Sequence, residues 1–149
     1  MARHGVVRST LDQDLLAVDP VCLQSESWAG LQSSGVEAEI RKGDLYDPLL
    51  GVVRFSAPGE RPVDLVVGKF VWQREVIARA LVHPGGEVPV VRAVDLILLK
   101  LYAGGPQDAW DIQQLLAAED RETLISQVDQ ELAQLPAESA LLWRKILDG

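Results

Sequence analysis

Short apolar runs, broken by Gly, Pro, Asp and Ser, make up the chain as far as about residue 92. Runs of this length that are rich in Val, Leu and Ile predict strands. A Pro58-Gly59 turn signal separates two of them, so we expect those two to form a hairpin. The expected strands cover residues 6–7, 15–18, 36–40, 49–55, 63–67 and 88–91.

Two helices are expected to interrupt this strand-rich region. Residues 26–32 predict a short helix, for which Ser25 is a suitable N-cap because its hydroxyl can accept a backbone N–H bond. Residues 71–81 predict a second helix, in which Trp72, Val76 and Ala80 recur every fourth position and so share one face.

From Ala93 onward the apolar residues keep the i, i+3, i+4, i+7 spacing of buried helix stripes. Gly104-Gly105-Pro106 separates the first of these helices from the next, and the fourth begins at Pro136. Because no linker or repeat divides the chain, we expect one α+β domain over residues 1–149. That domain is strand-rich over 1–92 and helical over 93–149.

Composition narrows the function classes. The 149 residues carry a net charge of -8, which argues against a broad electrostatic platform for nucleic acid and suits binding of cations or of a basic partner. The single cysteine allows no internal disulfide, as expected in a reducing compartment. No apolar stretch of membrane-spanning length and no signal-peptide run occurs, so we expect a cytoplasmic protein without a membrane partner.

Asp12 and Asp14 lie two residues apart, so in a strand both side chains point to the same face. Two close carboxylates repel each other unless a cation lies between them, and carboxylate oxygens suit Mg²⁺. The pair therefore predicts a site for a nucleotide-bound magnesium. Alternatively, it is one of the Asp-x-Asp pairs that occur by chance in turns and exposed strands.

Asp64 places a charge inside the otherwise apolar run 63–67. A carboxylate there must face solvent, pair with a cation or bind a metal. A strand with one solvent-exposed face would explain the charge at Asp64 without a catalytic or metal-binding role. Two-metal phosphoryl transfer, in contrast, uses a third carboxylate beside the first two, which bridges to the second metal or helps to deprotonate the attacking hydroxyl.

Four segments in order along the chain are similar to the motifs of a known family. They are His-Gly-Val-Val-Arg-Ser-Thr-Leu-Asp-Gln-Asp at 4–14, Pro-Val-Asp-Leu-Val at 62–66, Val-Asp-Leu-Ile-Leu-Leu-Lys-Leu-Tyr-Ala at 94–103, and Gln-Asp-Ala-Trp-Asp-Ile at 107–112. Together, over residues 3–118, they resemble the DNA polymerase beta-like nucleotidyltransferase superfamily. The likeness is greatest to the small prokaryotic branch that includes AbiEii-type toxins of toxin–antitoxin systems.

The resemblance implies a mixed β-sheet flanked by helices, with a C-terminal helical part. It implies that Asp12, Asp14 and Asp64 hold Mg²⁺, with Asp64 as the third carboxylate and candidate base. Lys100 would face the nucleotide phosphates, and Asp108 would lie on the rim of the same cleft. An NTP would be the nucleotidyl donor. The acceptor would be RNA, a protein or a small molecule. An antitoxin or another protein would be a binding partner.

Simpler roles compete with several of these assignments. Arg8 is suited to bidentate phosphate binding, but it would equally neutralise the Asp12–Asp14 pair. Lys100 can extend from a core-facing position to water. Asp108 and Asp111 lie near the start of a helix, where acidic residues favour the helix dipole, and for Asp111 we prefer that structural role.

The family also carries a Gly-Gly or Gly-Ser turn before its metal-binding strand, and only Met1 to Arg3 precede His4 here. Backbone N–H groups at such a turn bind phosphate well. The chain is therefore expected to be either clipped or a degenerate member. Three hypotheses follow: an active nucleotidyltransferase, a non-catalytic module of the same fold that binds a protein, and an unrelated α+β domain with solvated aspartates.

Overall fold

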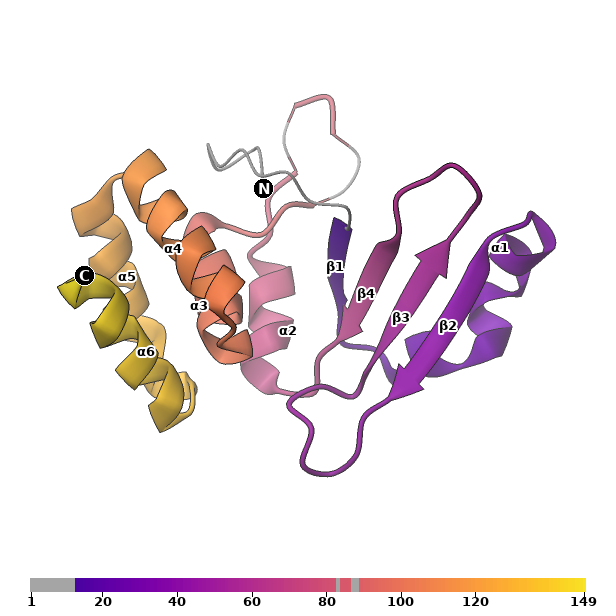
Figure 1. Cartoon of the computed structure of the whole chain (residues 1–149), viewed down its shortest axis with the longest axis horizontal. Coiled ribbons are helices and arrows are strands. Elements are labelled where there is room, and N and C mark those ends of the chain that lie inside the picture. Colours follow the sequence, from indigo (N-terminus) through magenta and orange to yellow (C-terminus); the bar gives the residue numbers. More distant parts are fainter. Residues whose placement is uncertain (1–12, 83, 87–88) are drawn as a thin grey trace. The chain divides into compact units, whose positions relative to one another are not determined.

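The computed structural model describes residues 13–82, 84–86 and 89–149. Within those residues the chain divides into two compact units, of residues 13–78 and 79–149 (Figure 1). The first holds a mixed four-stranded sheet, and the second is mainly helical, which confirms the predicted α+β class with a helical C-terminal part. The strand predicted at residues 6–7 lies outside the described residues.

The sheet has the strand order β1-β4-β3-β2. Its strands are β1 (Gln13–Ala17), β2 (Glu37–Lys42), β3 (Gly51–Ser56) and β4 (Val63–Val67), close to the predicted ranges. β1 runs parallel to β4, whereas β3 is antiparallel to both β4 and β2. The predicted β3–β4 hairpin is confirmed: Glu60 N–H donates to the Ala57 carbonyl at 3.1 Å, and Gly59 takes a φ of +77° in the turn.

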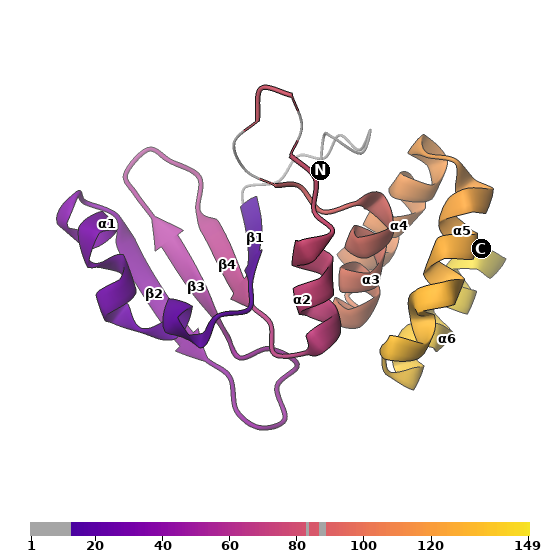
Figure 2. The same ribbon diagram turned by 180° about the vertical axis from the view of Figure 1, so that it is seen from behind.

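One face of the sheet forms the core of this unit. Leu23, Val53, Leu65 and Val67 are buried together, because alternate residues of a strand point to the same face. Trp28 packs edge-on against Phe55 with ring centroids 4.8 Å apart. The segment that supplies Leu23 and Trp28 consists of η2 (Pro20–Leu23), η3 (Ser25–Trp28) and α1 (Ala29–Ser33), and Figures 1 and 2 show α1 beside β2.

The helix predicted at residues 26–32 begins as the 3₁₀ turn η3 and continues as the α-helix α1, and Ser25 is not its N-cap. Gln24 holds the cap position without a side-chain bond, so that prediction is wrong. Tertiary bonds explain the difference. The Trp28 indole donates to the Cys22 carbonyl at 2.8 Å and the Ser27 hydroxyl to the Val21 carbonyl at 2.6 Å, which draws the segment against the preceding turn.

Two predictions near residues 78–91 are also changed. Helix α2 (Val71–Ala78) ends three residues earlier than expected. The chain leaves it to form an isolated bridge between Leu81 and Val90, with N–H···O distances of 2.9 and 2.8 Å. Among the described residues of the strand predicted at 88–91, this bridge is the only pairing.

Four longer helices form the second unit: α3 (Ala93–Ala103), α4 (Pro106–Ala118), α5 (Arg121–Glu131) and α6 (Ala137–Asp148), with a short η4 (Leu132–Gln134) after α5. Gly104 ends α3 in the left-handed conformation at φ +71°, and Pro106 opens α4 at its first position. The predicted apolar stripes are buried, including Ile97 and Leu101 of α3 and Ile112 and Leu115 of α4.

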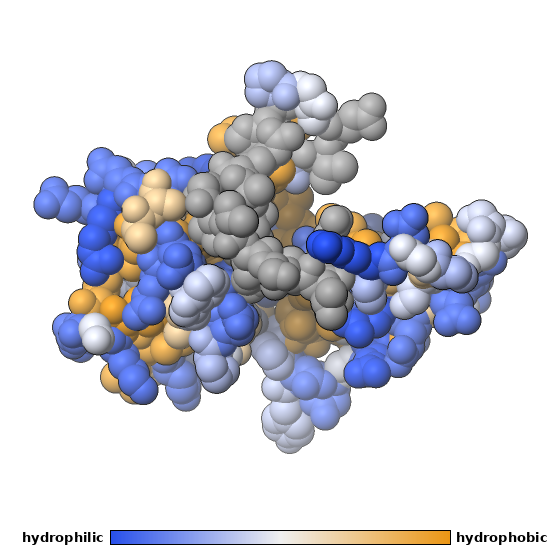
Figure 3. Space-filling view, turned by 45° about the horizontal axis from the view of Figure 1, so that its top comes forward, coloured by the Kyte–Doolittle hydropathy of each residue, from blue (hydrophilic) through white to orange (hydrophobic). Residues whose placement is uncertain are grey.

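Two polar contacts fix α6 within this unit. The Ser139 hydroxyl donates to the Leu101 carbonyl at 3.1 Å, and the Trp143 indole donates to Asp129 at 2.8 Å. The surface seen in Figure 3 is mostly hydrophilic, with small apolar patches. Of the helices in the described ranges, none is long and apolar enough to cross a membrane.

Replacing Ile112 by Ala should lower the free energy of unfolding by about 2–5 kcal/mol, because the side chain is fully buried and its removal leaves a cavity. Leu141→Ala on α6 is the matched control, since that leucine is 65% exposed, and it should change stability by less than about 0.5 kcal/mol. Urea denaturation followed by circular dichroism measures both. Equal effects of the two substitutions would contradict the described packing.

Candidate functional site

Asp14 and Asp64 lie side by side on the sheet. They are register partners on the parallel strands β1 and β4, so their side chains leave the same face. That face is opposite the one on which Leu65 and Val67 are buried. Asp14 is exposed and the Asp64 carboxylate is 18% exposed, so both carboxylates stand on the side of the sheet away from its core.

The row of charges continues across the sheet. Arg54 on β3 is the register partner of Asp64 and donates to both of its oxygens, from Nε at 2.9 Å and from Nη2 at 3.0 Å. Glu39 on β2 is the next register partner and accepts from Arg41 Nε at 3.0 Å. Three carboxylates and one guanidinium therefore occupy the row.

Two of the predicted site residues, Arg8 and Asp12, lie outside the described residues. In the described ranges, no group of three or more His, Cys, Asp and Glu side chains is arranged to hold a metal ion. The Asp14–Asp64 pair supplies two of the three carboxylates that the sequence motifs nominate. The proposed Mg²⁺ ligand set therefore stays a prediction.

Lys100 of α3 forms a buried ion cluster with α4. Its Nζ donates to Asp111 at 2.7 Å and to Asp108 at 3.4 Å. The Lys100 side chain is only 11% exposed, and that of Asp111 is fully buried. Gln107 also donates to Asp111, at 3.3 Å. The ammonium group is thus held between two carboxylates rather than extended to water.

This cluster revises the simpler roles considered for its members. Asp111 is a buried counter-ion of Lys100, so its structural role includes an ion pair in addition to any effect on the helix dipole. Asp108 accepts the Gly105 N–H at 3.0 Å as well as the Lys100 contact, so it closes the first turn of α4 and joins the ion cluster. The sequence does contain a signal for the Lys100–Asp111 pairing. Lys100 interrupts an apolar helix, and Asp111 follows eleven residues later, after the Gly-Gly-Pro turn.

Asp95 is a second buried carboxylate, to which the sequence motifs assign no role. It is 0% exposed and accepts from Arg79 Nη2 at 2.8 Å and from Arg92 Nε at 2.8 Å. Arg92 stands three residues before Asp95, a spacing that brings side chains together at a helix start. Arg79 is remote in sequence, so its part in the cluster has no local signal.

The structure therefore brings Asp14 to Asp64 in one unit, and Lys100 to Asp108 in the other. No known family model matches the chain, and no curated protein matches it. Roles for these residues follow from their own geometry and from the sequence motifs.

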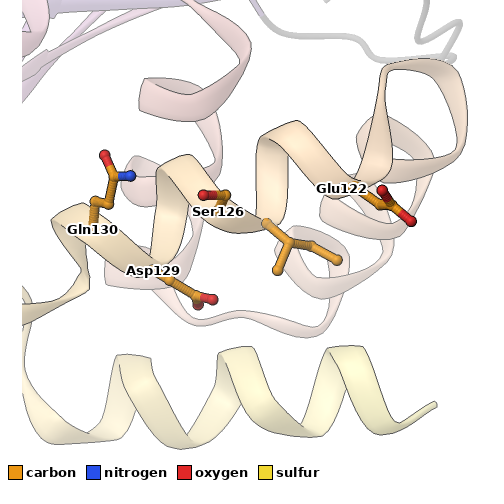
Figure 4. A pocket seen from close by; sticks show the side chains of 5 residues that line it. Glu122, Ser126, Asp129 and Gln130 are labelled. Carbon is orange, nitrogen blue, oxygen red and sulfur yellow. The ribbon is translucent and has the colours of Figure 1, made fainter.

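Two further features of the described residues have no part in the predicted site. A shallow pocket lies along α5 and is lined by side chains of that helix alone (Figure 4), namely Glu122, Ile125, Ser126, Asp129 and Gln130. Cys22 is half-buried, and burial together with the charge of Asp19 raises the pKa of its thiol. A thiol with a raised pKa stays protonated near neutral pH and is a poor nucleophile.

The Lys100–Asp111 pair gives a double-mutant test. Lys100→Met should lower the free energy of unfolding by about 3–5 kcal/mol, because it leaves a buried carboxylate without its cation. Adding Asp111→Asn should restore part of that loss, so the two effects will not be additive. Lys145→Met on the exposed surface of α6 is the matched control and should have little effect. Additive effects measured by urea denaturation would contradict a direct ion pair.

Proposed function

We propose that the chain is a Mg²⁺-dependent nucleotidyltransferase, which transfers a nucleotidyl group from an NTP to a hydroxyl of an RNA, a protein or a small molecule. The observation that supports it most is the register of Asp14 with Asp64. Residues 50 positions apart in sequence, picked out by two separate motifs, are direct neighbours on parallel strands and share one face. If the two aspartates were only solvated surface residues, nothing would require them to be register partners on one face.

The two carboxylates fit a magnesium ion by their chemistry. Neighbouring strands lie about 4.8 Å apart, which lets side chains on one face share a cation. Mg²⁺ takes one or two protein carboxylates and completes its shell with water and substrate phosphate. Asp64 already accepts two bonds from Arg54, but each carboxylate oxygen has a second lone pair. Arg54 therefore fixes the direction of the Asp64 carboxylate without using all of its acceptor capacity.

In this proposal Asp14, with Asp12 and Asp64 as the motifs imply, would hold the ion. When bound, Mg²⁺ supplies positive charge that stabilises the triphosphate during transfer. Asp64 accepts the proton of the acceptor hydroxyl while the oxygen of that hydroxyl bonds to the α-phosphorus of the NTP. The bond from that phosphorus to the bridging oxygen breaks, and pyrophosphate leaves. Arg54 keeps Asp64 aimed at the acceptor as a positioning residue.

The resemblance adds a biological setting to the same proposal. An enzyme of this class in the small prokaryotic branch would act as the toxin of a toxin–antitoxin pair, and an antitoxin would bind it. As the resemblance implies, Lys100 and Arg8 would then contact the nucleotide phosphates, and Asp108 would lie on the rim of the cleft. For Lys100 that role requires the ammonium to give up part of its contact with Asp108, the longer of its two bonds at 3.4 Å.

A second candidate function is a non-catalytic module that binds a protein partner. It is favoured by the internal pairing of Asp64 with Arg54 and of Lys100 with Asp111, which occupies two of the groups that catalysis would use. Leu45 and Tyr46, 91% and 94% exposed between β2 and β3, would supply contact area for a partner. This candidate predicts no NTP binding in the presence of Mg²⁺ and a stable complex with a protein.

Calorimetric titration with each of the four NTPs and Mg²⁺ separates the two candidates. The enzyme should bind at least one NTP, and Asp14→Asn and Asp64→Asn should each weaken that binding by at least about tenfold, or 1.4 kcal/mol. Asp12→Asn should do the same. Glu60→Gln, which removes an exposed negative charge in the β3–β4 turn, is the matched control and should bind like the wild type.

Two results would count against the nucleotidyltransferase. Undiminished binding in the aspartate variants would place the nucleotide elsewhere. A folded wild-type chain that binds none of the NTPs with Mg²⁺ would favour the protein-binding module instead.

A further inference from the structure

Strand β2 is an edge of the sheet, and within the described residues only β3 pairs with it. Figures 1 and 2 show it as the outermost strand, with α1 beside it. An edge strand carries backbone N–H and C=O groups that have no strand partner, and such a row of groups is a template for pairing with another chain. The pairing of β2 with β3 decides which residues direct these groups outward.

The odd-numbered residues of β2 bond to β3. Gly43 N–H, just past the strand, donates to the Leu50 carbonyl at 2.8 Å, and hydrogen-bonded pairs alternate along an antiparallel ladder. The Arg41 carbonyl also lies toward β3, directly against Gly51. The backbone groups of the even-numbered residues therefore point away from the sheet. These residues are Ala38, Ile40 and Lys42.

The segment before β2 supports this direction. Val36, which is also even-numbered, donates its N–H to the Leu31 carbonyl of α1 at 3.1 Å. That bond occupies the edge just before the strand begins. Within the described part of the chain, no other element bonds to the outward backbone groups of Ala38, Ile40 or Lys42. The edge therefore has donors and acceptors at three alternate positions.

Charges are sorted along the same strand. Glu37 and Glu39 precede Arg41 and Lys42, so acidic residues occupy the first half of β2 and basic residues the second. Charged side chains on an edge usually prevent pairing, but that role requires no particular order of the charges. When two copies of a strand with sorted charges pair antiparallel, the acidic half of each lies opposite the basic half of the other. Strand β2 is therefore complementary to itself.

One register satisfies both the charges and the backbone groups. Pairing Ile40 with Ile40 of a second copy places Glu39 opposite Arg41 of that copy, and the same contact recurs by symmetry. Ile40 and its copy exchange both backbone bonds, and Ala38 does the same with Lys42 of the second copy. Glu39 and Arg41 then form a non-hydrogen-bonded pair, in which opposed side chains lie closest and opposite charges attract.

Other registers are less favourable. Centring the pair on Glu39 would oppose two carboxylates. A slip of one residue would pair Glu39 with Ile40 and turn the core face of one copy toward the charged face of the other. In the register centred on Ile40, Ala38 and Ile40 lie on the same side of the sheet in both copies. Because both residues pack against the sheet core, the apolar core continues across the junction.

We propose that β2 pairs antiparallel with β2 of a second copy and joins two sheets in an isologous dimer. Arg41 Nη2 already contacts Glu39 of its own chain at 3.0 Å, but both side chains are more than half exposed. Such a surface pair contributes little, so its exchange for a pair between copies costs little. The dimer does not rest on the proposed nucleotidyl transfer, because none of the nominated site residues takes part in it.

Sedimentation of the full chain over a concentration series tests the dimer. The contact is small, so we expect a Kd of about 10–100 µM. Arg41→Glu should weaken association by at least about tenfold, because it opposes two carboxylates at two symmetric places. Glu39→Arg should do the same by opposing two cations. Arg121→Glu makes the same charge change at an exposed position of α5, and it should sediment like the wild type.

Mixing the two variants separates edge pairing from a loss of folding. Arg41→Glu has acidic residues at both 39 and 41, and Glu39→Arg has basic residues at both. Each variant alone should be monomeric where the wild type dimerises, whereas the mixture should form a heterodimer. A chain that carries both substitutions should again dimerise with itself. Circular dichroism of each single variant checks that its fold is retained.

Amide NMR locates the contact. On dilution, the amides of Ala38, Ile40 and Lys42 should shift and exchange their hydrogens faster, while those of Glu39 and Arg41, already bonded to β3, should change less. The proposal is overturned if the wild type stays monomeric up to about 500 µM, well above the expected Kd. It is also overturned if the single variants dimerise as the wild type does, or if their mixture fails to associate.

Discussion

The parallel pairing of β1 with β4 is the constraint on which the candidate site depends. Leu65 and Val67 must reach the core on one face of β4, so Asp64, one residue before Leu65, must leave the other face. A slip of one residue would bury the carboxylate and expose the leucine. Gly68 N–H bonds to the Ala17 carbonyl at 2.8 Å, which closes the far end of the pair and fixes the same register. Apolar burial thus sets the position of the carboxylates.

The helical unit uses buried charge differently. Lys100 with Asp111, and Asp95 with its two arginines, are taken out of water at a considerable desolvation penalty. Attraction between the partners offsets much of that penalty, and the remaining benefit is geometric, because a buried pair has one arrangement of its atoms. In the Lys100 cluster the geometry connects α3 to α4. In the Asp95 cluster it holds Arg79 and Arg92 beside the start of α3.

Periodicity predicted most of the fold because it reports burial directly. The range of β4 was predicted without error, and the apolar stripes of α3 and α4 are buried as expected. The errors fall where tertiary bonds outweigh local preference. The Trp28 indole donates to the Cys22 carbonyl, and the first turn of the helix predicted at residues 26–32 is 3₁₀. Leu81 pairs with Val90 and shortens another helix.

The candidate site was only partly accessible to the same reasoning. Strand alternation places Asp64 on a polar face, but its alignment with Asp14 depends on a parallel pairing between segments 50 residues apart, for which no local pattern exists. The partner Arg54 was missed for the same reason, since the residue opposite Asp64 on the neighbouring strand depends on the cross-strand register. Arg79 is the extreme case, because sixteen residues and a bridge separate it from Asp95.

The central claim is that Asp14 and Asp64 share a divalent cation, and paramagnetic broadening by Mn²⁺ tests it most directly. Mn²⁺ accepts the same carboxylate ligands as Mg²⁺ and broadens amide resonances near its site. In the presence of ATP, substoichiometric Mn²⁺ should first broaden the amides around Asp14 and Asp64, and an Asp14→Asn, Asp64→Asn double variant should lose that effect. Broadening centred on another acidic segment, such as Asp44 and Asp47 in the β2–β3 loop, or unchanged in the double variant, would contradict it.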